Sequence, residues 1–209
     1  MKTGPGEPVA GPWRVQRLDD LAGSLTGARA IAVDGRGGSG KSTLADRLAA
    51  RLPGSVVVHT DDVAWNHSRF GWDDLMIDGI LTPFRAGRGV RYQPPAWAPH
   101  GRTGEIAFPA ETSALIIEGV GASRRDFAGL LDVAIWVQSD YEDARLRGVS
   151  RDMARDGHDE ETALRLWWEW EEEEVPFLIA DRPWERADII VAASPVLPHD
   201  PDTEVAVNR

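Results

Sequence analysis

The stretch Gly35-Arg-Gly-Gly-Ser-Gly-Lys-Ser42 decides the fold of this chain, because it matches the phosphate-binding pattern G-x-x-x-x-G-K-[ST]. Glycines let backbone N–H groups converge on one oxyanion, and the helix that follows points its positive end at the same place. The lysine of the pattern reaches the β- and γ-phosphates, and the hydroxyl binds Mg²⁺. We therefore expect ATP and Mg²⁺ as cofactors, bound by Gly35, Arg36, Gly37, Gly38, Ser39, Gly40, Lys41, Ser42 and Thr43.

Strand and helix patterns alternate on both sides of this loop. Short apolar runs predict strands over 30–34, 55–60, 114–119, 132–137 and 187–191. Apolar residues at helical spacing, together with helix stop signals, predict helices over 13–28, 42–51, 140–156 and 160–175. This alternation is typical of an α/β fold with a parallel sheet.

The 209 residues suit one domain, which we place at 13–193. Residues 1–12 and 194–209 are rich in Pro, Gly and Asp, and we expect flexible tails there. Prolines, glycines and tryptophans gather in 62–113, which predicts an insertion of short helices and a hairpin rather than core strands.

Composition excludes several classes of protein. A net charge of −11 argues against binding to nucleic acid or to anionic membranes. The chain has no cysteine, so disulfides and thiolate chemistry are excluded, and its five histidines show no metal-binding spacing. There is no run of 18 apolar residues and no signal-peptide core near the N-terminus, so we expect a cytoplasmic protein.

The larger classes of phosphate-loop proteins carry further motifs that this sequence lacks. GTPases have N-K-x-D and ABC-type ATPases have LSGGQ, and neither occurs here. Helicases and motor ATPases usually need longer chains. A kinase of small molecules is the class that remains.

Two aspartates follow the strand predicted over 55–60. Because ligands bind at the carboxyl ends of parallel strands, Asp61 and Asp62 should lie beside the phosphate loop. Asp61 is the candidate base that takes the proton of an acceptor hydroxyl, and it could also contact the metal. The alternative for Asp61 is a helix N-cap. Asp62 could bind the acceptor, cap the helix in the same way, or coordinate the metal or a water molecule.

Glu118 ends the next predicted strand, where it could hold Mg²⁺ through water, contact the acceptor, or simply occupy a turn. Further on, Arg147, Arg151 and Arg155 are four residues apart and share one helix face. Arginines stabilise the charge that gathers on a phosphoryl group in transfer, so residues 140–160 are predicted to form a lid. We take Arg151 as the catalytic candidate and Arg147 and Arg155 as candidates for binding the nucleotide, and the spacing leaves open which of the three contacts a phosphate. The alternative is a solvated face with an Asp143–Arg147 pair.

In this order, these pieces resemble the uridine kinase / phosphoribulokinase family of P-loop kinases. The matches are 33–42, Thr60-Asp61-Asp62, Ile116-Ile117-Glu118-Gly119, Arg145 to Asp152 and 187–190. The resemblance implies a P-loop NTPase fold with a five-stranded parallel sheet flanked by helices, and Asp61 as the residue that deprotonates the acceptor. It also implies a substrate-side hairpin formed by 91–94 and 104–109. The family's aromatic after the aspartate is replaced here by Asp62-Val63-Ala64-Trp65, which puts uridine as acceptor in doubt.

Aromatic and basic residues of the insertion could recognise the acceptor. Trp65 and Tyr92 could stack on a planar or sugar-like group, and Arg69 could read its polar groups, although such residues can equally pack a small core of their own. Trp167 and Trp170 should face the core of their helix, whereas Glu169 and Glu171–Glu174 should form its solvated face.

The sequence thus predicts an ATP-dependent kinase that phosphorylates a hydroxyl of a small metabolite. A kinase with a phosphorylated acceptor and an ATP-binding accessory protein without catalysis remain as alternatives. The identity of the acceptor stays open, as does self-association into a homo-oligomer, which is common in the resembling family.

Overall fold

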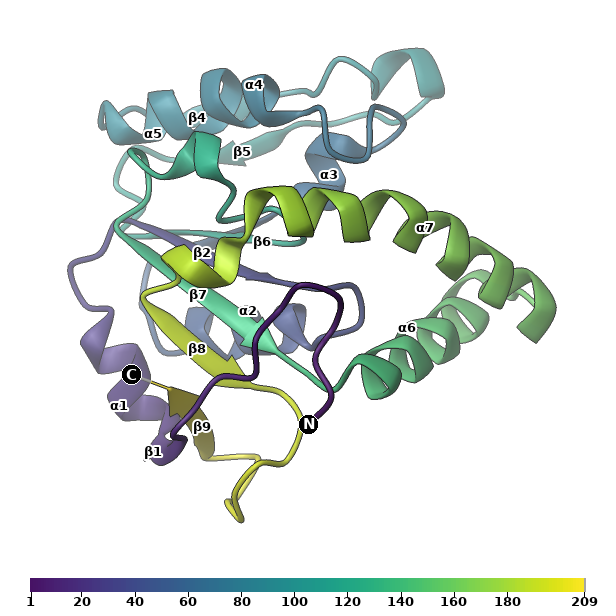
Figure 1. Cartoon of the computed structure of the whole chain (residues 1–209). Coiled ribbons are helices and arrows are strands. Elements are labelled where there is room, and N and C mark those ends of the chain that lie inside the picture. The colour runs from purple at the N-terminus through teal and green to yellow at the C-terminus, as the bar shows by residue number, and fades with distance from the viewer. Residues whose placement is uncertain (209) are drawn as a thin grey trace.

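The computed structural model describes residues 1–208, and its centre is a seven-stranded mixed sheet flanked by helices (Figure 1). The strands lie in the order β1-β9-β8-β7-β2-β6-β3. Their bounds are β1 Arg14–Arg17, β2 Ala30–Gly35, β3 Val56–His59, β6 Leu115–Glu118, β7 Val133–Gln138, β8 Ile189–Ala192 and β9 Glu204–Asn208.

Five of these strands are those that the sequence predicts, and they pair in parallel. β2 lies between β6 and β7, β3 pairs with β6, and β8 pairs with β7. β2 is buried along its whole length, as expected of a central strand covered on both faces. The α/β fold class is therefore confirmed, with the carboxyl ends of β2, β3 and β6 at one edge of the sheet.

The other two strands correct the sequence prediction. The segment 13–28, predicted as helix, begins with β1, and the segment 194–209, predicted as a flexible tail, contains β9. β9 pairs antiparallel with both β8 and β1, and its Val205, Ala206 and Val207 are buried. The sheet therefore has seven strands rather than five, because β9 covers the edge of β8 and is itself covered by β1.

Alternate residues of β2 point to two separate hydrophobic cores, as the two-residue period of a strand requires. Ile31 and Val33 pack with the helices α1 and α2, whereas Ala30 and Ala32 pack with the insertion. The helices are α1 Leu18–Ser24, α2 Lys41–Ala49, α3 Thr60–Ala64, α4 Asp73–Met76, α5 Thr82–Arg85, α6 Tyr141–Asp156, α7 Glu160–Asp181 and α8 Pro183–Arg186.

The insertion 62–113 has the predicted character. Short helical segments, including the π-helix η1 (Ile77–Leu81), lead to a two-stranded antiparallel hairpin of β4 (Val90–Tyr92) and β5 (Ile106–Phe108). Two 3₁₀ turns, η2 Ala98–His100 and η3 Arg125–Phe127, complete the elements. The insertion covers one face of the sheet and shares a hydrophobic core with it, in which Trp72, Met76 and Phe84 are fully or almost fully buried.

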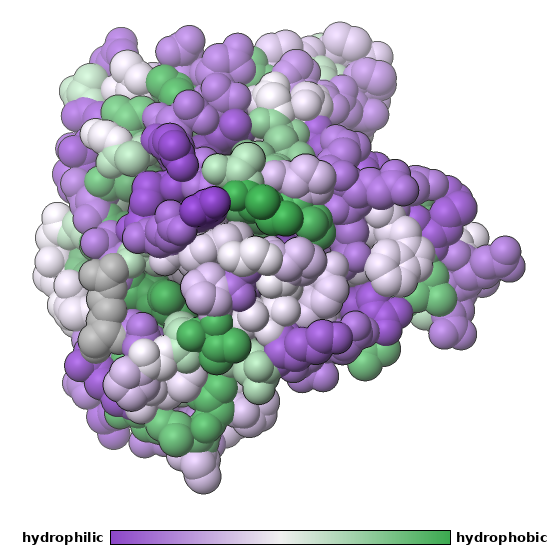
Figure 2. Space-filling view, in the orientation of Figure 1, coloured by the Kyte–Doolittle hydropathy of each residue, from purple (hydrophilic) through white to green (hydrophobic). Residues whose placement is uncertain are grey.

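Helices α6 and α7 pack against each other and project to one side of the sheet (Figure 1). Figure 2 shows a mostly hydrophilic surface on this projection in the same orientation. Helix α7 continues through Pro176 to Asp181, six residues beyond the predicted end. No helix among the described residues is long and apolar enough to cross a membrane.

The N-terminal segment, predicted as a flexible tail, instead packs against the sheet and the phosphate loop. The buried Glu7 accepts hydrogen bonds from Trp136 Nε1 at 2.6 Å and Gln138 Nε2 at 2.8 Å. It also forms a 3.2 Å ion pair with Arg36, whose guanidinium is buried as well. A charged side chain that finds such partners orders the segment around it, which composition alone does not reveal.

Replacing Glu7 with alanine should lower the free energy of unfolding by about 3 kcal/mol. The reason is that the Arg36 guanidinium and the Trp136 indole N–H would stay buried without their acceptor. Urea denaturation checks this, with the exposed Glu111 changed to alanine as the control. An equal stability of both variants would contradict the packing role of the N-terminal segment.

Candidate active site

One cavity of about 610 Å³ opens at the carboxyl edge of the parallel strands. Its wall joins the phosphate loop, the end of β3 with α3, the end of β6, and the facing sides of α6 and α7. Among the predicted site residues it brings together Gly37, Lys41, Ser42, Asp61, Asp62, Trp65, Arg69, Glu118, Arg151 and Arg155. Residues far apart in sequence thus meet in a single site, as the topology of a parallel sheet predicts.

The phosphate loop runs from the end of β2 to the start of α2. Gly38 and Gly40 have φ angles of 68° and 96°, which side chains other than glycine rarely adopt. Helix α6 approaches the loop so closely that a Cβ atom at Gly38 would lie 2.0 Å from the Ala144 carbonyl oxygen. The loop therefore needs glycine at Gly38 both for its backbone conformation and for this contact.

Changing Gly38 to alanine should lower the free energy of unfolding by about 2 kcal/mol, because the methyl group would push α6 off the loop. Arg147 should then lose its hydrogen bond to the Gly38 carbonyl as well. Thermal unfolding measures the effect. Gly129, where an added Cβ would meet nothing within 4 Å, is the matched alanine control, and an equal loss there would contradict the prediction.

Two side chains of α2 lie at the phosphate loop in the expected way. Lys41 is buried, and its Nζ donates a 2.9 Å hydrogen bond to the Arg36 carbonyl oxygen. The Ser42 hydroxyl donates to Glu118 Oε1 at 3.1 Å. Ser42 and Glu118 thus place a hydroxyl and a carboxylate together beside the loop.

Glu118 connects the phosphate loop to the end of β3. Its second oxygen lies 2.6 Å from Nδ1 of His59, a residue that the sequence analysis did not single out. Burial alone would raise the pKa of Glu118, but the hydrogen bond with His59 and the charge of Lys41 together lower it. The same hydrogen bond raises the pKa of His59. Glu118 is therefore held as a carboxylate next to two polar partners, rather than as a simple turn residue.

Oxygen donors of this kind fit Mg²⁺. Within residues 1–208, no three His, Asp or Glu side chains group closely enough to hold a metal ion by themselves. Mg²⁺ commonly uses one or two protein oxygens and takes its other ligands from phosphates and water. The Ser42 hydroxyl and the Glu118 carboxylate would serve as those protein ligands. That Asp61 also contacts the metal stays a prediction.

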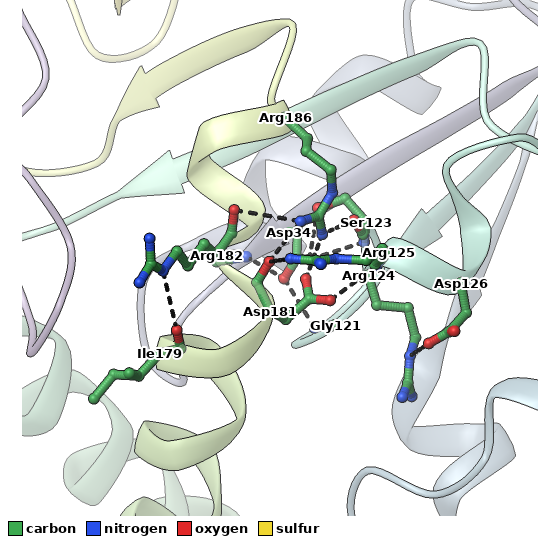
Figure 3. Close-up of polar contacts among 11 residues, drawn as sticks. Asp34, Gly121, Ser123, Arg124, Arg125, Asp126, Ile179, Asp181, Arg182 and Arg186 are labelled. Atoms are coloured by element: carbon green, nitrogen blue, oxygen red, sulfur yellow. Dashed lines mark hydrogen bonds and ion pairs between the residues drawn. The ribbon is translucent and has the colours of Figure 1, made fainter.

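A buried aspartate that sequence reasoning missed fixes the start of the loop. Asp34, the last residue before Gly35, accepts hydrogen bonds from the backbone N–H groups of Gly35, Gly121 and Ser123, and from the Ser123 hydroxyl, at 2.7–2.9 Å (Figure 3). Burial raises the pKa of Asp34, although these four hydrogen bonds oppose the effect. They tie the end of β2 to the segment after β6.

The two aspartates after β3 differ in their surroundings. Helix α3 begins at Thr60 with His59 as its N-cap residue, so Asp61 lies in the first turn and is not the cap. Asp61 is exposed to the cavity. Asp62 instead forms a 2.5 Å ion pair with Arg102, and Trp97 Nε1 donates to its backbone oxygen at 2.8 Å. Asp61 is therefore the carboxylate left available for an incoming group.

The lid arginines occupy two different places. Arg147 donates from Nε to the Gly38 carbonyl at 3.0 Å. It therefore contacts the phosphate loop outside the cavity and does not pair with Asp143. Arg151 and Arg155 line the cavity, where they pair with Asp152 and Asp156 of their own helix. Arg151 and Arg155 thus lie on one face of α6, as their spacing predicts. That they contact a phosphate stays a prediction.

The residues proposed to bind the acceptor are only partly brought together. Trp65 and Arg69 line the cavity, and the Arg69 guanidinium lies 5.8 Å from the Trp170 ring centre. Tyr92 does not line it; its ring packs against Gly79 in the π-helix of the insertion. Tyr92 thus belongs to the small core of the insertion, because the glycine leaves room for its ring.

Helix α7 also differs from the sequence prediction. Trp167 is buried as expected, but so are Glu171 and Glu174, which were predicted on the solvated face. Glu174 Oε1 accepts a 2.6 Å hydrogen bond from the Gly37 backbone N–H. A run of four glutamates suggests a solvated surface, but the helix buries two of them, and Glu174 contacts the phosphate loop.

Among the solved structures that match this chain, two are similar to it over most of their length. One is described as a "possible uridine kinase" from Bacillus stearothermophilus, with 18% sequence identity, a TM-score of 0.53 and coverage of 83% of this chain and 96% of that chain. The other is a "putative fructose transport system kinase" from Silicibacter sp. TM1040, with 20% identity, a TM-score of 0.56 and coverage of 82% and 95%. Protein-family models and curated protein sequences give no match. At these identities the likeness concerns the fold, and the chain has the fold of P-loop kinases of the uridine kinase type that its sequence resembles.

Proposed function

We propose that this chain is an ATP-dependent phosphotransferase that phosphorylates a hydroxyl group of a small, neutral metabolite. One observation carries the proposal: Lys41 and Ser42 of the phosphate loop share a cavity with the exposed carboxylate of Asp61. A protein that only binds nucleotide needs the loop but no base. A kinase needs both, with the base facing the terminal phosphate.

In this mechanism the acceptor oxygen attacks the γ-phosphorus while the bond from that phosphorus to the bridging oxygen of ADP breaks. Asp61 takes the hydroxyl proton as the new bond forms. Lys41 and Arg151 offset the negative charge on the transferring group. Mg²⁺, held by Ser42 and Glu118, would supply further charge neutralisation at the phosphates. Closed packing of α6 and α7 over the cavity would keep water from the γ-phosphate.

The charges around the cavity favour a neutral acceptor over a phosphorylated one. Apart from His59, the charged side chains of the cavity wall balance, with four cations and four carboxylates. The cations are Lys41, Arg69, Arg151 and Arg155, and the carboxylates are Asp61, Asp62, Glu118 and Asp152. Arg69, the arginine of this set that is not assigned to the nucleotide, is already paired with Glu173 at 3.0 Å. An acceptor phosphate would need guanidinium groups free for bidentate contacts. A nucleoside-monophosphate type of kinase is therefore the weaker alternative.

The apolar part of the cavity wall indicates what kind of molecule carries the acceptor hydroxyl. Indole rings and aliphatic side chains from the segment between α3 and α4, from α7 and from the loop after β6 line it: Trp65, Trp72, Val120, Leu166, Trp167 and Trp170. Such a surface suits a planar or sugar-like molecule that carries its hydroxyl toward Asp61. Because ATP is the proposed donor, we also propose the cytoplasm as its compartment.

An acceptor screen tests the proposal. Purified protein with Mg²⁺–ATP is offered sugars, nucleosides, vitamin-like alcohols and their monophosphates, and ADP release is measured. We expect acceptor-dependent release with a neutral alcohol and none with its monophosphate. Turnover restricted to monophosphates would favour the phosphorylated-acceptor alternative, and ATP binding without turnover on any compound would favour an accessory protein.

A further inference from the structure

The Arg36–Gly37 peptide group of the phosphate loop is held from both ends. Its carbonyl oxygen accepts a 2.9 Å hydrogen bond from Lys41 Nζ, and its N–H donates a 2.6 Å hydrogen bond to Glu174 Oε1. The ammonium and the carboxylate thus bind the two ends of one peptide dipole. The orientation of this peptide decides where the Lys41 ammonium rests, and Glu174 opposes its rotation.

Glu174 reaches the loop from a helix that also forms the cavity wall. It follows Trp170 by one helical turn on α7, and Trp167 and Trp170 lie against Gly37, with atoms 3.4 Å and 3.1 Å from the position that an added Cβ would take there. Gly37 and both tryptophans line the cavity. The contact therefore lies at the border between α7 and the part of the loop that faces the proposed terminal phosphate.

The burial of Glu174 is costly for the fold. Its side chain has no exposed surface, and its second oxygen has no hydrogen-bond partner among the described residues. Burial raises the pKa of this carboxyl. The buried Arg36 guanidinium pairs with Glu7, not with Glu174, in the ion pairs of the described residues. An apolar side chain of similar size would avoid this cost but would leave the Gly37 N–H without its acceptor, so the hydrogen bond to the loop is what the glutamate provides at this position.

We infer that Glu174 is a positioning residue of the nucleotide site, which holds the Arg36–Gly37 peptide so that the Lys41 ammonium is placed for the phosphates. The inference rests on the proposed function, because it needs ATP as a ligand of the loop. Glu174 acts through the peptide and Lys41, and it touches neither substrate.

Binding of Mg²⁺–ATP to the full chain, measured by calorimetry, tests this. Glu174→Met should weaken ATP binding at least tenfold in a protein that still unfolds cooperatively, because methionine cannot accept the hydrogen bond from the Gly37 N–H. Glu174→Gln should bind within about threefold of the unchanged protein, because its amide oxygen can still accept from Gly37. Glu172→Met, an exposed position on the same helix, is the control and should change neither ATP binding nor cooperative unfolding.

A double-mutant cycle separates positioning from a general packing role. If Glu174 acts through Lys41, Glu174→Met should have no further effect on ATP binding in a Lys41→Met background. Additive losses would overturn the inference, as would normal ATP binding by Glu174→Met or a Gln variant as weak as the Met variant. Should the Met variant not fold, Glu174→Asp takes its place with the same expected loss, since its carboxylate is one methylene short of Gly37.

The proposed function fails in a different way. If the unchanged protein does not bind ATP, the function is wrong, whatever the variants do. If it binds ATP and Glu174→Met binds equally well, only the positioning role is wrong.

Discussion

The Asp61→Asn variant is expected to bind ATP normally and to lose about 10²–10⁴-fold in kcat with the acceptor found by screening. Asp61 is the carboxylate at the end of β3 that faces the cavity shared with Lys41 and Ser42. Asp62 pairs with Arg102, whereas the Asp61 carboxylate has no ion pair among residues 1–208 and is available to accept a proton. Asparagine keeps the shape of the side chain but cannot act as a base.

Asp62→Asn is the matched control for this change. The carboxylate of Asp62 is paired with Arg102 at 2.5 Å, and Arg102 also lies 3.6 Å from the ring centre of Trp97. Because this carboxylate supports the wall rather than the reaction, its loss should cost less than about tenfold in kcat. Calorimetry with ATP and the ADP-release assay measure both variants. Full activity of Asp61→Asn, or a larger loss for Asp62→Asn, would reject Asp61 as the base.

The sequence predicted the part of the fold that depends on local pattern. The phosphate loop is specific because its chemistry demands glycines, a lysine and a hydroxyl at fixed spacing. The five parallel strands are buried on both faces and therefore appear as short apolar runs such as 114–119. Once the strands were placed, topology alone predicted that Asp61 and Glu118 would meet beside the loop, and they do.

What the sequence missed depends on contacts between distant residues. Glu7 lies in a segment rich in Pro and Gly. Nothing in the local sequence indicates that its carboxylate will pair with Arg36 and accept a hydrogen bond from Trp136. Strand β9 is short and follows a loop, so its pairing with β8 and β1 decides its structure. Asp34 could have been suspected, since a charged residue ending a fully apolar strand is unusual and calls for buried hydrogen bonds.

The glutamate run of α7 shows the limit of reasoning from charge alone. Glu171 and Glu174 are three residues apart, so they share a helix face with Trp167, and that face is buried. The charge of the glutamates favoured a solvent-exposed helix face, whereas the spacing of Glu171 and Glu174 from Trp167 favoured a buried one. At a functional site the spacing can prevail, because a buried acid can be held for its role rather than for stability.

Replacing Lys41 with methionine should lower kcat/KM for ATP by about 10²–10³-fold, the usual effect of removing one donor aimed at the charge of a transition state. Methionine fills nearly the same space, so the buried position should stay packed. The Arg36 carbonyl would lose its 2.9 Å hydrogen bond, with a cost in unfolding free energy of about 1 kcal/mol. The loss should therefore appear in nucleotide binding and turnover, with little change in the melting temperature.

The composition of the chain supplies an unusually clean control. Lys2 and Lys41 are its only lysines, and Lys2 is exposed. Lys2→Met should leave the kinetic constants for ATP unchanged. In the unchanged protein, ATP should protect Lys41 from an amine-acylating reagent while Lys2 stays reactive, which peptide mass spectrometry can follow. If ATP gave Lys41 no protection, or if Lys41→Met kept normal kcat/KM, the phosphate loop would not be the ATP site, and the kinase proposal would lose its foundation.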